Sequence, residues 1–341
     1  MQTRPLGHSG IDVSLICLGT KTWGEQNTQA EAFEQMDYAL SRSVNFWDAA
    51  EMYPEPVNKE TAGETERIIG NWFSQTGRRS EVILATKVIG RSDRTWMRDG
   101  RTPRLTPEQI DLALDGSLKR LQTDYVDLYQ VHWPDRPMGL FGEGNGSYVH
   151  KGTSDVVPIE ETLGALGDLV KSGKVRAIGV SNETPWGLGR YLAAADELNL
   201  PRVVSIQNSY SLINRLFESG LSEFAWRENV GLLAYSPLGM GTLSGKYVGG
   251  TTPDRSRLAL FPQFMQRYQS TVARDAITRY AELAREYDLT PTAIALGFVN
   301  SRPFVTSNIV GATSIEQLRE NIDTAEVTIS PELESAIDQV H

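Results

Sequence analysis

The chain has 341 residues, of which 40% are hydrophobic and 22% charged, and a formal net charge of −10 at pH 7. This composition predicts a globular protein with a large buried core and excludes a disordered adaptor. An acidic balance also opposes non-specific nucleic-acid binding, which normally uses a basic surface, so we expect no nucleic-acid partner.

The first segment, residues 1–14, contains a Gly-rich hairpin signal in PLGHSGIDVS (5–14). It lacks the basic and then apolar layout of a signal peptide, and no run of about 18 apolar residues occurs anywhere in the chain. We therefore expect a cytoplasmic protein with no membrane partner.

Eight short apolar runs then alternate with amphipathic helical stretches. Most runs are nearly continuous in Val, Ile and Leu, which is typical of parallel strands covered by helices. The helical stretches, such as 28–42, 106–121, 159–173 and 274–287, repeat apolar residues three and four apart. The runs are 14–20, 44–50, 82–88, 125–133, 175–182, 203–210, 231–238 and 307–313.

The order of strand then helix, repeated eight times, favours a single (β/α)8 TIM barrel domain over residues 1–341, with an N-terminal β-hairpin. An open doubly wound sheet remains an alternative, because strand order is not visible in a sequence. Three long segments, 89–104, 134–158 and 239–270, each follow a strand. In a barrel they would lie at the C-terminal face, where active sites are built.

Four polar residues lie where consecutive apolar runs end. Asp48 follows VNFW, Lys87 follows VILAT and His132 follows VDLYQV, while Tyr53 comes five residues after Asp48. Because the C-terminal ends of neighbouring barrel strands converge, we expect these four side chains to meet.

Each of these residues also has an ordinary structural explanation. Asp48 is compatible with a helix cap and Tyr53 with a packed loop ring. Lys87 is compatible with a side chain that extends to solvent, and His132 with a hydrogen-bonded core histidine. Together they favour an acid site, because a lysine and an aspartate at the ends of apolar strands are costly unless paired.

Such a site suits carbonyl reduction, in which hydride transfer leaves an alkoxide that must be stabilised and protonated. A neighbouring ammonium favours the phenolate, so we expect Lys87 to lower the pKa of Tyr53. Asp48 would hold Lys87, and a neutral His132 would donate a hydrogen bond to the substrate carbonyl oxygen.

These residues resemble motifs of the aldo-keto reductase family. The likeness lies in DAAEMY (48–53), TKV (86–88) and DLYQVHWP (127–134), and it extends over almost the whole chain through CLGT (17–20), GKVRAIGVSNET (173–184), IQNSYSLINR (206–215), LLAYSPLGMGTLSGKY (232–247) and VGATSIEQLREN (310–321). The resemblance implies NADPH-dependent reduction of an aldehyde or ketone, with Tyr53 as proton donor and Asp48, Lys87 and His132 as the other catalytic residues.

The resemblance also implies a set of cofactor contacts. Ser181, Asn182 and Gln207 would bind the nicotinamide carboxamide, and Tyr235 would stack on the ring. Backbone donors of the 236–239 segment, helped by Lys246 and Arg257, would bind the pyrophosphate, and the start of the last barrel helix would bind the adenosine end. The complete expected set is Gly19, Thr20, Asp48, Ser181, Asn182, Gln207, Tyr235, Ser236, Pro237, Leu238, Gly239, Gly241, Lys246, Arg257, Gly311, Thr313, Gln317, Glu320 and Asn321.

One departure from the family concerns Gln317, where many relatives have an arginine. NAD therefore stays an alternative to NADP. For the substrate pocket we expect apolar walls from Trp23 and Trp133, with Met240 and Phe261 as further candidates, although aromatic residues are also common packing anchors.

Other classes of site are weakly supported. GEGNGS (142–147) lacks the spacing of a Rossmann loop, and GMGTLSGKY (239–247) lacks residues that a phosphate loop needs. The single cysteine, Cys17, is expected to be a packed strand residue, and four scattered histidines predict no metal site.

Two rival functions remain open. One is a barrel lyase that uses Lys87 as a Schiff-base nucleophile. The other is a redox-sensing, cofactor-binding regulator with slow turnover, as in the potassium-channel β subunits. The sequence predicts a small-molecule carbonyl substrate but neither its identity nor the oligomeric state.

Overall fold

The computed structural model describes residues 1–139, 150–152, 154–263 and 268–341. Eight strands form a closed barrel in the order β10-β3-β4-β5-β6-β7-β8-β9, and every neighbouring pair is parallel. The predicted (β/α)8 barrel is confirmed, and its closure excludes the open sheet. The barrel strands are β3 (Ile16–Gly19), β4 (Phe46–Asp48), β5 (Ile83–Val88), β6 (Val126–Val131), β7 (Val175–Ser181), β8 (Ser205–Ser209), β9 (Gly231–Tyr235) and β10 (Val305–Val310).

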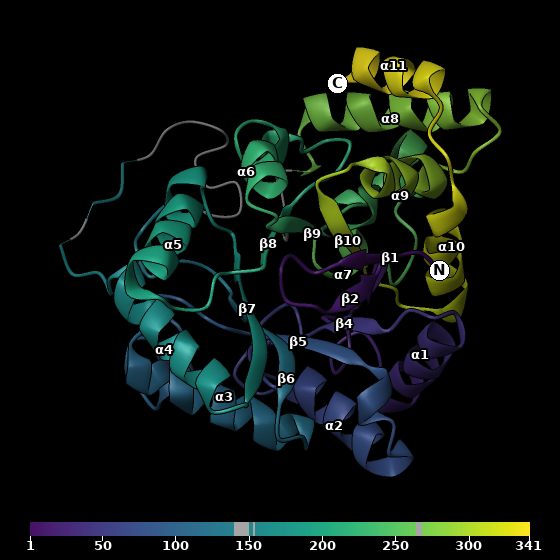
Figure 1. Cartoon of the computed structure of the whole chain (residues 1–341). Coiled ribbons are helices and arrows are strands. Elements are labelled where there is room, and N and C mark those ends of the chain that lie inside the picture. Colours follow the sequence, from purple (N-terminus) through teal and green to yellow (C-terminus); the bar gives the residue numbers. More distant parts are fainter. Residues whose placement is uncertain (140–149, 153, 264–267) are drawn as a thin grey trace.

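Helices surround the barrel, as Figure 1 shows. Several begin at a Ser or Thr whose side chain accepts from the backbone, with Pro as the first helical residue, as at Thr106, Thr184 and Thr290. The helices are α1 (Gln29–Ser41), α2 (Glu64–Thr76), α3 (Pro107–Leu121), α4 (Ile159–Lys171), α5 (Pro185–Leu198), α6 (Leu221–Arg227), α7 (Arg257–Leu260), α8 (Thr271–Glu286), α9 (Pro291–Ser301), α10 (Ile315–Asp323) and α11 (Pro331–Val340). None of the helices in the described ranges is long and apolar enough to cross a membrane.

The predicted N-terminal hairpin is also confirmed, as β1 (Thr3–Pro5) paired antiparallel with β2 (Asp12–Ser14). Its residues Leu6, Ile11 and Val13 share one buried cluster with apolar side chains from the strands. Cys17 belongs to this cluster as expected, and burial raises the pKa of its thiol. The hairpin thus closes one end of the barrel with an apolar layer.

The polar residues of interest lie one layer further along the same strands. Phe46, Ala85 and Leu128 are in the apolar cluster, and side chains two residues on point to the same face of a strand. The residues two positions on are Asp48, Lys87 and Gln130. Strand periodicity therefore places a carboxylate, an ammonium and an amide above the sealed layer, at the C-terminal end of the barrel.

The long segments after β5, β6 and β9 are confirmed as post-strand connections, and the described residues of the first and the last include short helices. Segment 89–104 includes the 3₁₀ helix η2 (Thr95–Arg98), and segment 239–270 includes η5 (Gly239–Ser244), η6 (Val248–Gly250) and α7. Most of the 142–155 stretch lies outside the described residues.

A buried ion pair joins the loop after β5 to the turn after β4. Arg98 of η2 donates to both carboxylate oxygens of Glu51, at 2.8 and 2.7 Å, and each side chain is 3% exposed. Glu51 Oε1 also accepts from the backbone N–H of Ile89 at 2.8 Å. Glu51 lies two residues before Tyr53, so this pair anchors the loop that carries the expected acid.

Replacement of Arg98 by Ala should destabilise the fold by about 3 to 5 kcal/mol, because it leaves the Glu51 carboxylate buried and unpaired. The measurement is the free energy of unfolding from urea denaturation. The matched control is Arg101→Ala, which removes an exposed ion pair with Glu108 and should cost less than about 1 kcal/mol. Equal losses in the two variants would contradict the assigned role.

Candidate active site

The structure brings the four predicted catalytic residues together at the C-terminal end of the barrel. Asp48 ends β4, Lys87 lies in β5 and His132 directly follows β6. Tyr53 lies in the turn after β4, where its N–H donates to Ala50 O at 3.1 Å and its carbonyl accepts from Gly63 N at 2.9 Å. All four side chains are buried.

Lys87 is the centre of this group. Its Nζ donates to Asp48 Oδ2 at 2.6 Å, to Ala49 O at 2.8 Å and to Tyr53 OH at 3.4 Å. Three acceptors match the three protons of an ammonium, and the Lys87 side chain is completely buried. The pairing that we inferred between Asp48 and Lys87 is therefore present, and Lys87 also contacts the phenol.

The second oxygen of Asp48 is held by two amides. Gln207 Nε2 donates to Asp48 Oδ1 at 2.9 Å, and Gln130 Nε2 donates to the same atom at 3.2 Å. Gln130 is a site residue that the sequence reasoning missed. The available signal was an amide within an otherwise apolar strand, two positions after an inward-facing leucine.

The pKa of Tyr53 moves in the opposite direction from our expectation. Burial raises it well above the ordinary value of 10.0, and the Asp48 carboxylate adds to the rise. The expected net lowering by Lys87 is wrong for this site, because burial of the phenol raises the pKa most and the Asp48 carboxylate offsets the charge of Lys87. The Tyr53 hydroxyl therefore keeps its proton throughout the neutral range.

His132 is held in the neutral form, as expected. Burial lowers its pKa well below the ordinary value of 6.5, and the charges of Lys87, Arg94 and Lys21 add to the fall. Its ring meets Tyr53 edge to face, with ring centroids 5.7 Å apart. Its Nδ1 is buried with no hydrogen-bond partner among the described residues, which is unusual for a buried polar atom outside a ligand site.

A cavity of about 1360 Å³ opens from this group. It exceeds the roughly 300 to 1,000 Å³ of a typical small-ligand pocket, so it has room for a large cofactor beside a substrate. Asp48, Tyr53 and His132 line it, whereas Lys87 lies behind them. Every residue expected to contact the cofactor lines this cavity except Gly239.

Four expected nicotinamide contacts form a single hydrogen-bonded group on one side of the cavity. Ser181 Oγ donates to Gln207 O at 2.7 Å, and Tyr235 OH donates to Asn182 Oδ1 at 2.7 Å. Asn182 Nδ2 donates to His132 O at 2.8 Å and has a left-handed φ of 52°. The group is thus hydrogen-bonded to the backbone carbonyl of His132.

The loop after β9 and the start of α10 also line the cavity. Ser314 caps α10, and Gln317 Oε1 accepts from Thr313 N at 3.1 Å. The expectation that Gly239 offers a backbone donor to the pyrophosphate needs correction. Its N–H already donates to Ser236 O at 2.9 Å, and it does not reach the cavity.

The substrate wall is only partly as expected. Trp133, Met240 and Phe261 line the cavity. Trp23 does not, because it is fully buried in the core between barrel and helices, where its Nε1 donates to Gln35 at 3.0 Å. Placing Trp23 in the pocket wall was wrong.

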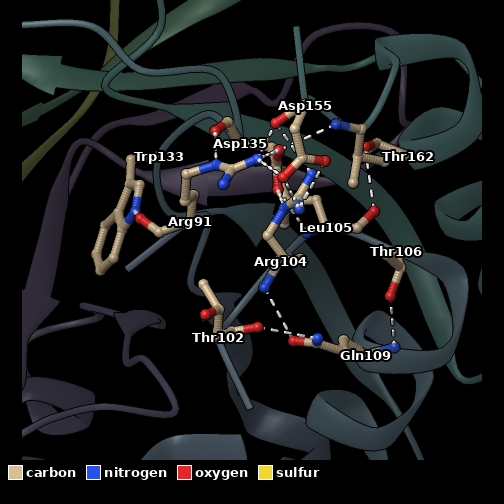
Figure 2. A network of polar contacts seen from close by, with 11 residues as sticks. Arg91, Thr102, Arg104, Leu105, Thr106, Gln109, Trp133, Asp135, Asp155 and Thr162 are labelled. Atoms are coloured by element: carbon tan, nitrogen blue, oxygen red, sulfur yellow. Dashed lines mark hydrogen bonds and ion pairs between the residues drawn. The ribbon is translucent and has the colours of Figure 1, made fainter. Parts of the chain in front are cut away.

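A network of hydrogen bonds and ion pairs holds Trp133, a residue of the cavity wall, in place. Trp133 Nε1 donates to Arg91 O at 2.9 Å. Figure 2 shows that Arg91 and Arg104 both point toward Asp135 and Asp155. The Asp135 side chain is 2% exposed and also accepts from the backbone of Leu105 and Val157. The loops after β5 and β6 are therefore joined beside the cavity.

No cluster of three or more His, Cys, Asp and Glu side chains suited to a metal ion is found within the described ranges.

Comparison with known proteins agrees with the geometry. A model of the Aldo/keto reductase family matches residues 15–341. The chain is 46% identical to "Protein tas" of Escherichia coli (strain K12) over 341 residues, which is all of this chain and 98% of that protein. It is 34% identical to "Uncharacterized oxidoreductase YrpG" of Bacillus subtilis (strain 168) over 336 residues, 98% of this chain and 94% of that protein.

A more distant similarity is to "Probable voltage-gated potassium channel subunit beta" of Arabidopsis thaliana, at 30% identity over 348 residues, all of this chain and 96% of that protein. The resemblance found in the strand-end motifs is confirmed by these matches along the whole chain. The chain belongs to the aldo/keto reductase family of oxidoreductases.

Proposed function

We propose that this chain is an NADPH-dependent reductase of aldehydes or ketones in which Tyr53 is the proton donor. The observation that carries the proposal is the contact of Lys87 with both Asp48 and Tyr53 beside a cavity large enough for a dinucleotide. An acid, its positioning ion pair and a neutral histidine are the groups that reduction of a carbonyl requires.

The residues around the cavity fit a nicotinamide cofactor, which supplies the hydride when bound. Ser181, Asn182 and Gln207 offer the hydroxyl and amide groups that bind a carboxamide, and Tyr235 offers an aromatic face. Lys246 and Arg257 line the cavity and would bind phosphate groups. Because Gln317 is uncharged, NADH stays a second candidate cofactor.

Tyr53 and His132 would act on the carbonyl oxygen. The neutral His132 donates a hydrogen bond that orients the carbonyl and stabilises charge as it develops on oxygen. Tyr53 then gives its proton to the alkoxide, which is a stronger base than a phenolate even where burial has raised the pKa of the phenol. Lys87 stabilises the phenolate that results.

A lyase that uses Lys87 as a nucleophile is disfavoured by the geometry. The Lys87 side chain is fully buried behind Asp48 and Tyr53, and its three protons already have acceptors. A Schiff base needs a neutral amine that reaches the substrate.

A cofactor-binding regulator is a second candidate, because of the similarity to the plant channel β subunits. Such a protein would keep the cavity and the acid group but would show very slow turnover. The two functions differ in rate, so the experiments below separate them.

Replacement of Tyr53 by Phe should lower kcat for reduction of an activated aldehyde such as 4-nitrobenzaldehyde by about 10² to 10⁴-fold, because the proton donor is lost. NADPH affinity, measured by fluorescence titration, should stay unchanged. NADPH binding without turnover in the wild type would favour the regulator, and an unaffected variant would exclude Tyr53 as the acid.

The rate of hydride transfer should be independent of pH from about pH 6 to about pH 9. The lowered pKa of His132 keeps it neutral across this range, and the raised pKa of Tyr53 keeps it protonated. The measurement is single-turnover NADPH oxidation by stopped flow, with circular dichroism to confirm folding. An acid limb near pH 6.5 would show that His132 titrates, and an alkaline limb below pH 9 would show that Tyr53 does.

A further inference from the structure

One cation at the cavity, Arg94, forms no ion pair with any described residue. It is half-buried, lines the cavity, and comes from the loop after β5. Its guanidinium donates to Ser92 Oγ at 3.4 Å, and no carboxylate within the described ranges lies at ion-pair distance from it. A half-buried guanidinium with a single weak neutral acceptor retains several donors for a ligand.

A second arginine of the same loop, Arg91, differs from Arg94 in that acidic side chains compensate its charge. Arg91 also lines the cavity, but its guanidinium is engaged by Asp135 and Asp155, as Figure 2 shows. Arg91 therefore supports the wall through its ion pairs, whereas Arg94 keeps its charge available to the cavity.

The loop that carries Arg94 lies beside the end of the cavity that holds His132, because Arg91 O accepts from Nε1 of Trp133, the residue after His132, at 2.9 Å. The charge of Arg94 contributes to the lowered pKa of His132, the residue that would contact the carbonyl oxygen. Arg94, Lys21 and Arg257 all act on the half-buried Glu55 carboxylate, so these three cations share one acid. Asp93, the next acidic residue along the loop, also lines the cavity but is exposed, so solvent screens its charge.

The loop that carries Arg94 contributes none of the expected cofactor contacts. Lys21 Nζ and Arg257 NH1 both contact Met240 Sδ, at 3.7 and 3.6 Å, beside the loop expected to bind pyrophosphate. Arg94 makes no such contact, and its loop instead lies against Trp133 of the expected substrate wall.

We propose that Arg94 binds an anionic group of the substrate, a carboxylate or a phosphate, so that this reductase acts on negatively charged aldehydes or ketones. This inference rests on the proposed reductase function. A guanidinium gives such a group two parallel charge-assisted hydrogen bonds, which a neutral analogue of the same shape cannot accept with equal strength.

The test compares three aldehydes of similar shape: 4-carboxybenzaldehyde, 4-formylphenyl phosphate and the neutral 4-formylbenzamide. The wild type should show a kcat/KM about 10 to 100-fold higher for at least one anion than for the amide, mainly through KM. The preferred anion identifies the group. Arg94→Gln should abolish the preference, and Arg94→Lys should restore part of it.

The matched control is Arg101→Gln, on the same loop but paired with Glu108 outside the cavity, which should keep the full preference. Equal kcat/KM for all three aldehydes in the wild type would overturn the proposal, as would an equal loss for all three in Arg94→Gln. An NADPH Kd that rises in Arg94→Gln by the same factor would show that Arg94 belongs to the cofactor instead.

A binding experiment separates failure of this inference from failure of the reductase function. If no aldehyde is reduced, calorimetry on the NADP-loaded protein compares 4-carboxybenzyl alcohol and 4-(phosphonooxy)benzyl alcohol with 4-(hydroxymethyl)benzamide. Tighter binding of an anion that is lost in Arg94→Gln would support Arg94 as the anion site, and equal binding of all three compounds would overturn it.

Discussion

The ion pair between Lys87 and Asp48 is the interaction on which the site depends. Burying an unpaired ammonium or carboxylate is costly, so each of these residues is tolerated at the end of an apolar strand only because of the other. The other hydrogen-bonding positions of both groups are also occupied. Ala49 O and Tyr53 OH accept from Lys87, and the side chains of Gln130 and Gln207 donate to Asp48. The Tyr53 hydroxyl is thereby held beside an ion pair whose two charges compensate each other.

The barrel makes this arrangement possible through strand periodicity and closure. Side chains two residues apart on β4, β5 and β6 form first an apolar layer, sealed by the hairpin, and then the polar layer. The buried Glu51 and Arg98 pair ties the turn that carries Tyr53 to the loop after β5. The same loop carries Arg94 into the cavity, so the fold connects the acid to the proposed anion site.

Much of the fold followed from the sequence, because near-continuous Val, Ile and Leu runs mark the eight strands and their ends mark Asp48, Lys87 and His132. Trp23 was misplaced because a turn directs its ring toward Gln35, a contact that residue order does not reveal. The direction of the Tyr53 pKa shift was missed because it depends on how deeply the phenol is buried and on the nearby Asp48 carboxylate, neither of which residue order reveals. Short helices between residues 239 and 270 were hidden by a Gly- and Pro-rich composition typical of loops.

The central claim is that Lys87, positioned by Asp48, supports proton transfer by Tyr53 during hydride transfer from a nicotinamide. The most direct test is a single turnover with NADPH deuterated at C4 of the nicotinamide, with the mass of the alcohol product measured for the wild type and for Lys87→Met. The account predicts one deuterium on the former carbonyl carbon in the wild type and a strongly slowed transfer in the variant, with NADPH still bound. Deuterium transfer at an unchanged rate in Lys87→Met would contradict it.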